Sequence, residues 1–469
     1  MSTLHKLRNH CLWLPLLLFM TACGGGGDNS SGQTPVEDND NDTPESNGYV
    51  WEEATPESVG MDSNKISAAF DAAFADGTYT QAALVIKDNK LVYERYRGIL
   101  PGEASTLAIS LNREPEDFDD TYGTRDRFSI ATSWSTAKSF TSVLIAIAIE
   151  QGHIDSLQQS ASKFITEWAD DDRSQISIRN LLDMRSGLDL VCFDSTVGAL
   201  GTCSESDGTG GALVFSDNQM TGCINRQLSQ TGVFRSWYSG IFESGYWVYS
   251  NCDTMVLGEI LYRATGQDLQ TYADINLFSK IGMQAQWWRD YDESAQVDGN
   301  YLAYCCLDAT PRDFAKFGQL LMNNGSWDGV QIIPSDYIDL IKNIVVDSVV
   351  AESFGGVISY GLQFWTMFPT TQSDGTVYPP ANRIYATKGY DGQYIMMDFD
   401  NNLVVVRNSI YNPSLSRSDE RRMKIVLGDL ESTNYVLSLP AGIGLLTGSS
   451  FSQAKLLYGV TQAINSSSQ

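Results

Sequence analysis

The stretch from Phe128 to Gly152 reads FSIATSWSTAKSFTSVLIAIAIEQG and predicts the helix around which the chain folds. Apolar residues spaced i, i+3, i+4 and i+7 form one helix face; here they are Phe140, Val143, Leu144 and Ile147. Isoleucines at 145 and 149 cover much of the opposite side. A helix that is apolar nearly all round lies in a core, and Gly152 can end it in the left-handed conformation.

Ser135 stands three residues before Lys138 where this helix begins. That spacing puts both side chains on one helix face, about 5–6 Å apart between Cβ atoms. A serine is a weak nucleophile until a base takes its proton, and a lysine with a pKa lowered by burial can be that base. The same Ser-x-x-Lys spacing recurs at 160–163 and 452–455, where we expect surface coincidences. The alternative for Ser135 is a solvated or helix-capping serine.

The positions of the three histidines exclude a Ser-His-Asp triad. His5 and His10 lie in an N-terminal targeting segment, and His153 follows a helix stop, where we expect a surface residue. Lysine and tyrosine are therefore the candidate bases for serine chemistry.

Tyr249-Ser250-Asn251 is the one Tyr-x-Asn in the chain and precedes a helix that we expect from Asp253 to Ala264. A tyrosine beside a lysine can exchange protons with substrate, and an asparagine can orient the lysine or bind a substrate amide. In the alternative interpretation, Asn251 caps the helix and Tyr249 belongs to the core.

The segment Thr387-Lys-Gly-Tyr-Asp-Gly-Gln393 precedes a strand near the C-terminus. Its glycines allow a ligand to approach the backbone closely. An N–H group at the strand edge could form an oxyanion hole together with the N–H of Ser135. The alternative is a plain turn into a hairpin.

The N-terminus predicts export. Lys6 and Arg8 precede a short apolar run broken by Pro15, too short to span a membrane as a mature helix. Met20-Thr-Ala-Cys23 resembles a bacterial lipoprotein processing box, so we expect residues 1–22 to be a signal peptide and Cys23 to be lipidated. The alternative is an ordinary secretory peptide cut near Ala22.

Residues 24–48 contain six acidic residues, no lysine or arginine, and much Gly, Asn, Ser and Pro, which predicts a flexible linker at 23–48. The net charge of the chain is −26, and removal of the signal makes it two units more negative. Such a surface repels nucleic acid and anionic lipid headgroups, so we expect membrane contact only through the anchor. A salt-rich habitat or a cationic partner would also fit this acidity.

Six cysteines follow Cys23, an even number that predicts disulfides in an exported protein; they are residues 192, 203, 223, 252, 305 and 306. We favour Cys192–Cys203, with Cys223–Cys252 as a weaker pairing. The adjacent Cys305 and Cys306 could bond to each other only through a strained ring, and their pairing stays open. A zinc site is disfavoured because no Cys-x-x-Cys pair occurs and one histidine remains, so we expect no metal and no cofactor.

Alternating β-prone runs at both ends of the chain predict two hairpins, 81–96 and 393–408. Helices are expected between them, among them one that starts at Thr310-Pro311 and is stopped by Gly325, and another near the C-terminus at 451–464. This order suggests one antiparallel sheet built from both chain ends, with a helical subdomain at about 130–335 inserted in a single domain, 49–469. Residues 189–235 show weak periodicity and predict a long disulfide-held loop walling a site.

Together these elements resemble the serine β-lactamase and penicillin-recognising hydrolase family over roughly residues 60–464. Ser135-Thr-Ala-Lys138 falls on its first motif and Tyr249-Ser-Asn251 on its second, in the class C form. Connecting segments resemble the family too; they are Ile178–Leu188, Leu257-Gly-Glu-Ile, Ala264-Thr-Gly266, Ile281-Gly-Met283 and Thr310–Gly318. The resemblance implies an α/β fold of the β-lactamase/transpeptidase type.

The resemblance also implies roles for individual residues. Ser135 would be the nucleophile, Lys138 the base that activates it, and Tyr249 the acid/base for the leaving group. It implies substrate-side positions for Asn251, Gly389, Tyr390 and Gln393.

The third motif departs from the family pattern. β-Lactamases of the family carry Lys-Thr-Gly, whereas this chain has Thr387-Lys388-Gly389. A shift of one along a strand points the side chain to the opposite face, so the cation that grips a β-lactam carboxylate is expected to be missing. The Gly-x-x-Gly-Gln form resembles instead the 6-aminohexanoate-oligomer hydrolase and esterase branch.

The sequence therefore predicts an exported serine hydrolase of the bacterial cell envelope that acts on a small ester or linear amide through an acyl-enzyme. One alternative is a hydrolase of D-amino peptides or of β-lactams. Another is a non-catalytic ligand-binding protein, which would have no use for the proton-transferring residues.

Overall fold

The structure is a computed structural model. It describes residues 49–111, 114–189, 191–194, 199–202, 213, 218–228, 239–242, 245–292, 294, 299–344, 349–351, 356–367, 370–371, 377–378, 384–410 and 450–464. All of them belong to one compact unit, Ser46–Gln469. The expected signal peptide, Cys23, the linker as far as residue 48 and Cys203 lie outside the described residues.

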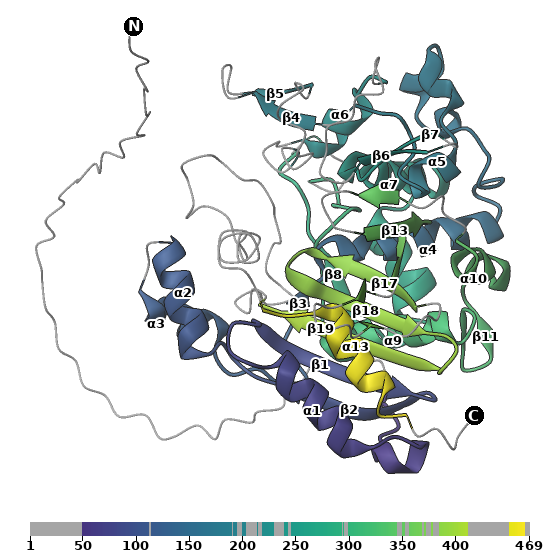
Figure 1. Cartoon of the computed structure of the whole chain (residues 1–469). Helices are drawn as coiled ribbons and strands as arrows, with labels where there is room; N and C mark the ends of the chain where they lie inside the picture. Colours follow the sequence, from purple (N-terminus) through teal and green to yellow (C-terminus); the bar gives the residue numbers. More distant parts are fainter. Residues whose placement is uncertain are drawn as a thin grey trace, which may run out of the picture. The chain divides into compact units, whose positions relative to one another are not determined.

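The centre of this unit is an eight-stranded sheet in which every neighbouring pair is antiparallel (Figure 1). Its order is β12-β13-β14-β17-β18-β19-β1-β2. The strands span β1 Thr80–Lys87, β2 Lys90–Tyr96, β12 Val349–Ala351, β13 Gly356–Gly361, β14 Phe364–Met367, β17 Ile384–Gly389, β18 Gln393–Asp398 and β19 Leu403–Ser409. The expected sheet built from both ends of the chain is confirmed, because β1 of the first hairpin pairs with β19 of the second.

Small sheets and hairpins accompany it. They are β3 Ala131–Thr132 with β9 Leu307–Ala309 and β8 Ala285–Trp287, β4 Val191–Asp194 with β5 Ala199–Thr202, β6 Ser239–Phe242 with β7 Gly245–Val248, β10 Ser326–Trp327 with β11 Val330–Gln331, and β15 Thr370–Thr371 with β16 Val377–Tyr378.

The α-helices of the described residues are mostly inserted between β2 and β12. They span α1 Ser63–Ala73, α2 Pro101–Leu111, α3 Pro115–Tyr122, α4 Ala137–Glu150, α5 Ile178–Leu182, α6 Gln219–Ile224, α7 Asn251–Thr265, α8 Leu269–Ala273, α9 Pro311–Met322, α10 Ser335–Lys342 and α13 Gln453–Thr461. A 3₁₀ turn, Trp134–Thr136, leads into α4.

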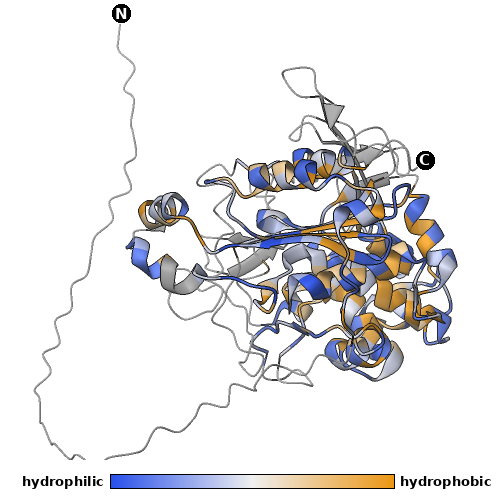
Figure 2. Cartoon of the chain, turned by 90° about the horizontal axis from the view of Figure 1, so that it is seen from below, coloured by the Kyte–Doolittle hydropathy of each residue, from blue (hydrophilic) through white to orange (hydrophobic). Residues whose placement is uncertain are grey.

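Helices cover both faces of the sheet. Side chains alternate along a strand, so Val85 and Val405 face α1 and α13, whereas Leu84 and Val404 face α9. Figure 2 shows hydrophobic colouring along the strands and on the helices packed against them. Gly318 allows α9 to lie close to the sheet, since a Cβ there would be 2.6 Å from Val404. The expected α/β class, an antiparallel sheet built from both chain ends and flanked by helices, is confirmed.

Local signals explain these elements. Asp88 and Asn89 take φ values of +53° and +66°, as a tight hairpin turn requires. Thr310 accepts a hydrogen bond from the N–H of Asp313 and so caps α9, as expected.

The described part of the segment 189–235 contains regular secondary structure that we did not expect. It includes the hairpin β4–β5 and helix α6, not only a long loop. Asn218 caps α6 by accepting from the N–H of Thr221, and Met220, Cys223 and Ile224 give the helix a buried side. A six-residue helix is too short for the sequence periodicity to reveal it.

Candidate active site

Ser135 lies on the 3₁₀ turn immediately before α4, with its side chain partly exposed. The preceding Trp134 has a φ of +46°, in the left-handed region that a bulky residue seldom adopts. Backbone strain of this kind concentrates at functional sites. The turn therefore presents Ser135 at the surface while the following helix enters the core.

Lys138 lies one turn further on, buried, and its amine reaches Ser135. Nζ donates to Ser135 Oγ at 3.1 Å, to Asn251 Oδ1 at 2.9 Å and to the carbonyl oxygen of Tyr304 at 2.8 Å. Burial lowers the pKa of Lys138 well below its ordinary value, because the charged form loses its hydration. None of its three hydrogen-bond partners carries a formal charge, so no counter-ion offsets the effect of burial on the pKa.

Asn251 is the first residue of α7 rather than its cap. The N-cap position belongs to Ser250, so the alternative in which Asn251 caps the helix is wrong. Helix α7 starts two residues earlier than expected, and this places the amide of Asn251 against Lys138.

The ring of Tyr249 lies against the amine of Lys138 and belongs to an aromatic cluster. The centroid of its ring is 5.0 Å from Lys138 Nζ and 5.4 Å from the ring of Trp365. Tyr360 and Trp247 complete the cluster, with ring centroids 5.9 and 6.3 Å from that of Tyr249. The cluster fixes the tyrosine beside the lysine and leaves it partly exposed.

The end of β17 passes directly against the serine turn. A Cβ on Gly389 would lie 2.1 Å from the carbonyl oxygen of Ser133, so only glycine fits there. Tyr390 is 39% exposed, and its ring lies edge-on to Trp134 with centroids 6.5 Å apart. The structure thus brings Gly389 and Tyr390 to the rim of the site.

Gln393 does not take the substrate-side position that we expected. Its side chain is buried, donates to Ser409 Oγ and the Ile410 carbonyl, and accepts from Asn408 Nδ2 and the N–H of Ser409. These bonds use both the oxygen and the nitrogen of its amide. They join the start of β18 to the end of β19, where Asn408 and Ser409 lie. Its role here is structural.

Thr387 and Lys388 point to opposite faces of β17, as expected. Thr387 is buried and donates to Thr136 Oγ1 at 3.2 Å. Lys388 Nζ lies 5.4 Å from the ring centroid of Trp365, and burial lowers its pKa to about 8. The first position of the third motif therefore holds no cation.

The other two Ser-x-x-Lys segments are helix starts. Ser160 accepts from the N–H of Ser162, and Ser452 accepts from the N–H of Lys455. Both serines are caps, which agrees with their expected role as coincidences. His153 is exposed, also as expected.

Sequence reasoning missed Tyr304, Trp365 and Tyr360. Tyr304 contributes a main-chain oxygen, which every residue has, so no side-chain signal marks it. The two aromatic residues lie on strands distant from Ser135 in sequence, and only the fold brings them to Tyr249.

Two disulfides lie beside these residues. Cys223–Cys252 is confirmed, with an S–S distance of 2.07 Å, and Cys305 is bonded to Cys306. The favoured Cys192–Cys203 pair falls partly outside the described residues. Within the described part of the chain, His, Cys, Asp and Glu side chains form no cluster able to hold a metal ion.

The sequence and the fold of this chain are similar to those of known proteins. Residues 67–429 match the family model described as Beta-lactamase. Similar solved structures include a penicillin-binding protein homologue from Caulobacter crescentus, with 13% identity, a TM-score of 0.53, and coverage of 88% of this chain and 100% of that one. EstCE1, a hydrolase with promiscuous acyltransferase activity, has 15% identity, a TM-score of 0.52, and coverage of 76% and 94%. A protein assigned as a 6-aminohexanoate-dimer hydrolase from Bacillus anthracis has 23% identity, a TM-score of 0.47, and coverage of 72% and 76%.

Proposed function

The chain belongs to the beta-lactamase family, and on that premise we propose that it hydrolyses a carboxylic ester or a linear amide through an acyl-enzyme on Ser135. The observation that carries the proposal is the contact of a buried lysine amine, whose pKa is lowered by burial, with the hydroxyl of a partly exposed serine. A general base must be within hydrogen-bond reach of the proton it takes and must be unprotonated at working pH.

The proposed acylation step uses three side chains. Lys138 takes the proton of Ser135 while Oγ attacks the substrate carbonyl carbon. The N–H of Ser135 and an N–H at the end of β17 would stabilise the developing oxyanion. Tyr249 passes a proton to the leaving alcohol or amine, and water then hydrolyses the ester on Ser135 by the reverse proton transfers.

We further propose that the protein is exported and anchored through a lipid on Cys23 in a bacterial envelope. Two disulfides in the described residues support an oxidising compartment, since disulfides are rare in the reducing cytosol. Among the described residues, no helix is both long enough and apolar enough to cross a membrane.

A fluorophosphonate probe tests the nucleophile. It should label the peptide that contains Ser135, and Ser135→Ala should abolish the labelling, because no other serine contacts Lys138 Nζ in the described part of the chain. Ser160→Ala and Ser452→Ala are matched controls and should label as the wild type does. Labelling that persists in Ser135→Ala would refute the assignment.

A substrate panel tests the reaction class. Purified protein should turn over a short-chain nitrophenyl ester or a linear amide. D-amino peptides are the third substrate class in the panel, because they test the alternative of a D-amino-peptide hydrolase. Labelling of Ser135 without turnover of any ester or amide would favour the binding-protein alternative.

A further inference from the structure

Helix α6 connects the two carbonyl groups that hold the amine of Lys138. We propose that Gln219 and the Cys223–Cys252 disulfide on this helix are positioning elements for the catalytic base. The inference rests on the proposed function, because it assumes that Lys138 is the base.

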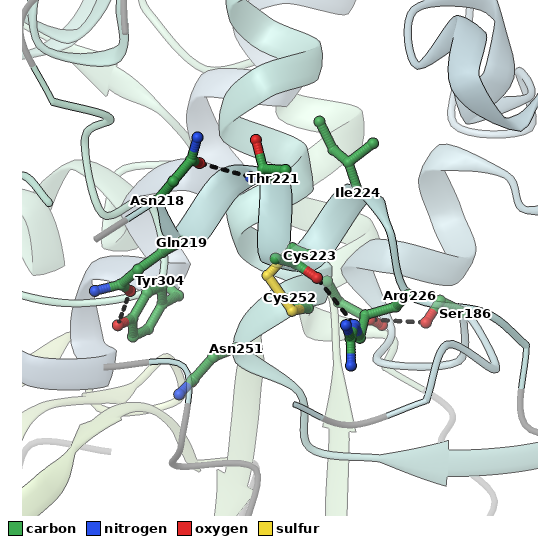
Figure 3. The surroundings of a disulfide bond; sticks show 12 residues. Ser186, Asn218, Gln219, Thr221, Cys223, Ile224, Arg226, Asn251, Cys252 and Tyr304 are labelled. Atoms are coloured by element: carbon green, nitrogen blue, oxygen red, sulfur yellow. Dashed lines mark hydrogen bonds between the residues drawn. A yellow bond between two sulfur atoms is a disulfide. The ribbon is translucent and has the colours of Figure 1, made fainter. Parts of the chain in front are cut away.

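The connection is a closed circuit of bonds that starts and ends at Lys138. Nζ donates to Asn251 Oδ1, and the next residue, Cys252, is bonded to Cys223. One turn earlier on α6, Gln219 Oε1 accepts from the hydroxyl of Tyr304 at 2.7 Å. The carbonyl oxygen of Tyr304 then accepts from Nζ. Figure 3 shows Asn251 beside Cys252 and the bond between Gln219 and Tyr304.

The members of the circuit are fixed in place. The side chains of Gln219, Cys223 and Cys252 are buried, and the main-chain N–H of Gln219 donates to Asp290 Oδ2 at 2.9 Å. The cap of α6 by Asn218 fixes the start of the helix. A displacement of α6 would therefore move Asn251 and Tyr304 together.

The amine needs both carbonyl groups for a chemical reason. A neutral amine has two hydrogens and one lone pair. As an ammonium, Nζ donates to all three oxygens; once it is neutral and donates its two hydrogens to Asn251 Oδ1 and Tyr304 O, its lone pair faces Ser135 Oγ, the third neighbour at 3.1 Å. Loss of either acceptor lets the amine rotate, and catalytic geometry tolerates little misplacement.

Two titratable side chains face the amine. The ring centroids of Tyr249 and Tyr304 lie 5.0 and 5.2 Å from Nζ. The neighbouring elements also carry Asp253 in the first turn of α7, Asp308 on β9 and Lys388 on β17. The low pKa of Lys138 is caused by burial. A loosened α6 would admit water, raise the pKa of Lys138 and move the acidic limb of the pH profile of kcat to higher pH.

The test is a double-mutant cycle on the full chain with a nitrophenyl ester. Gln219→Met and Tyr304→Phe should each lower kcat about tenfold with KM nearly unchanged, and should move the acidic limb of the profile to higher pH. The double variant should lose no more than the worse single variant, because both remove one shared bond. Cys223→Ser/Cys252→Ser, which leaves Cys305–Cys306 in place, should act in the same direction. The matched control, Thr221→Ala, changes an exposed side chain on the same helix and should behave as the wild type.

The readouts separate positioning from folding. Rates are expressed per molecule labelled by the fluorophosphonate. A variant that only loses folded protein then shows the kcat and the acidic limb of the wild type. Wild-type values of both in these variants would overturn the proposal. If Gln219→Met fails to fold, Tyr304→Phe tests the proposal instead, because it removes only the hydroxyl that donates to Gln219. Wild-type protein that neither labels at Ser135 nor turns over ester would refute the proposed function itself, which is a different outcome.

Discussion

At the scale of residues, the site depends on a lysine amine that is held away from water among uncharged oxygen acceptors. Lys138 is buried, its pKa is lowered by the loss of hydration, and its partners are oxygens without formal charge. A carboxylate neighbour would have stabilised the ammonium, raised its pKa and kept the amine protonated, so that it could not accept a proton. In the described part of the chain no carboxylate is hydrogen-bonded or ion-paired with Lys138, and the carbonyl groups of Asn251 and Tyr304 take the contacts.

Replacement of the base gives the first prediction at this scale. Lys138→Ala should lower kcat/KM by about 10²–10⁴, the usual contribution of a general base. Lys163→Ala, in one of the coincidental Ser-x-x-Lys segments, should leave kcat/KM unchanged. Activity of Lys138→Ala within a fewfold of wild type would require another base, and Tyr249 would be the next residue to replace.

At the scale of elements, the site lies where α4, α7 and β17 meet. Each contributes its end: the turn before α4 carries Ser135, the first residue of α7 is Asn251, and the last residue of β17 is Gly389. Helix and strand ends have unpaired main-chain groups, which makes them suited to bind substrate or orient side chains. A substitution at one of these ends should therefore disturb the site through that one helix or strand.

The first turn of α7 contains a buried carboxyl group whose titration should be visible in stability. Burial raises the pKa of Asp253 to about 7, and Ser186 donates to it at 2.7 Å. Between about pH 3.9, the ordinary value, and pH 7 the folded state binds a proton that the unfolded state does not. The contribution of Asp253 to the free energy of unfolding therefore decreases as pH rises through this window.

Asp253→Asn should flatten that dependence, since an amide can still accept from Ser186 and carries no charge at any pH. Thermal unfolding measured from pH 4 to 8 checks this. The control is Asp71→Asn at a surface ion pair, which should follow the wild-type profile. A variant curve parallel to that of the wild type would contradict the assignment of this titration to Asp253.

The register of β17 predicts poor hydrolysis of β-lactams. Thr387 occupies the position where β-lactamases of the family place a cation, and a charge-assisted bond to a carboxylate contributes roughly 1.5–3 kcal/mol. Its loss costs about ten- to a hundredfold in kcat/KM, since 1.36 kcal/mol is tenfold. Nitrocefin should therefore give a lower kcat/KM than a short-chain nitrophenyl ester on the same preparation. If nitrocefin is the better substrate, Lys388→Ala becomes the test, because its ammonium lies against Trp365, which contacts Tyr249.

At the scale of the whole molecule, distant segments meet through the sheet and through disulfides. β1 and β19 pair although more than 300 residues separate them. Cys223–Cys252 closes a loop across 29 residues and ties α6 to α7. Covalent links of this kind suit a protein whose large negative charge opposes compaction.

Intact mass before and after reduction and alkylation tests these links. Protein purified without reductant should contain at least two disulfides, and peptide mapping should give Cys223–Cys252 and Cys305–Cys306. In the chain-entropy model, the longer link contributes about 3.5 kcal/mol to the free energy of unfolding, so Cys223→Ser/Cys252→Ser should unfold at a clearly lower temperature. Six free thiols in that preparation would rule out both links.

The sequence by itself determined the two hairpins and the buried helix that follows Ser135 and contains Lys138. Ser135 and Lys138 could be predicted as a pair because i, i+3 spacing is a property of any helix, and the hairpins because strand alternation and turn residues are local signals. The disulfide between Cys223 and Cys252 was one of several pairings that spacing allowed.

Only the tertiary structure decided which oxygens surround the amine. The Tyr304 carbonyl is a main-chain group without a sequence signal, and α6 is too short for its periodicity to be recognised. Asn251 was predicted beside the lysine or the substrate, but its place depends on α7 starting at that residue. Gln393 was expected near substrate and instead joins two strands, because the contacts of a side chain depend on what the fold packs against it.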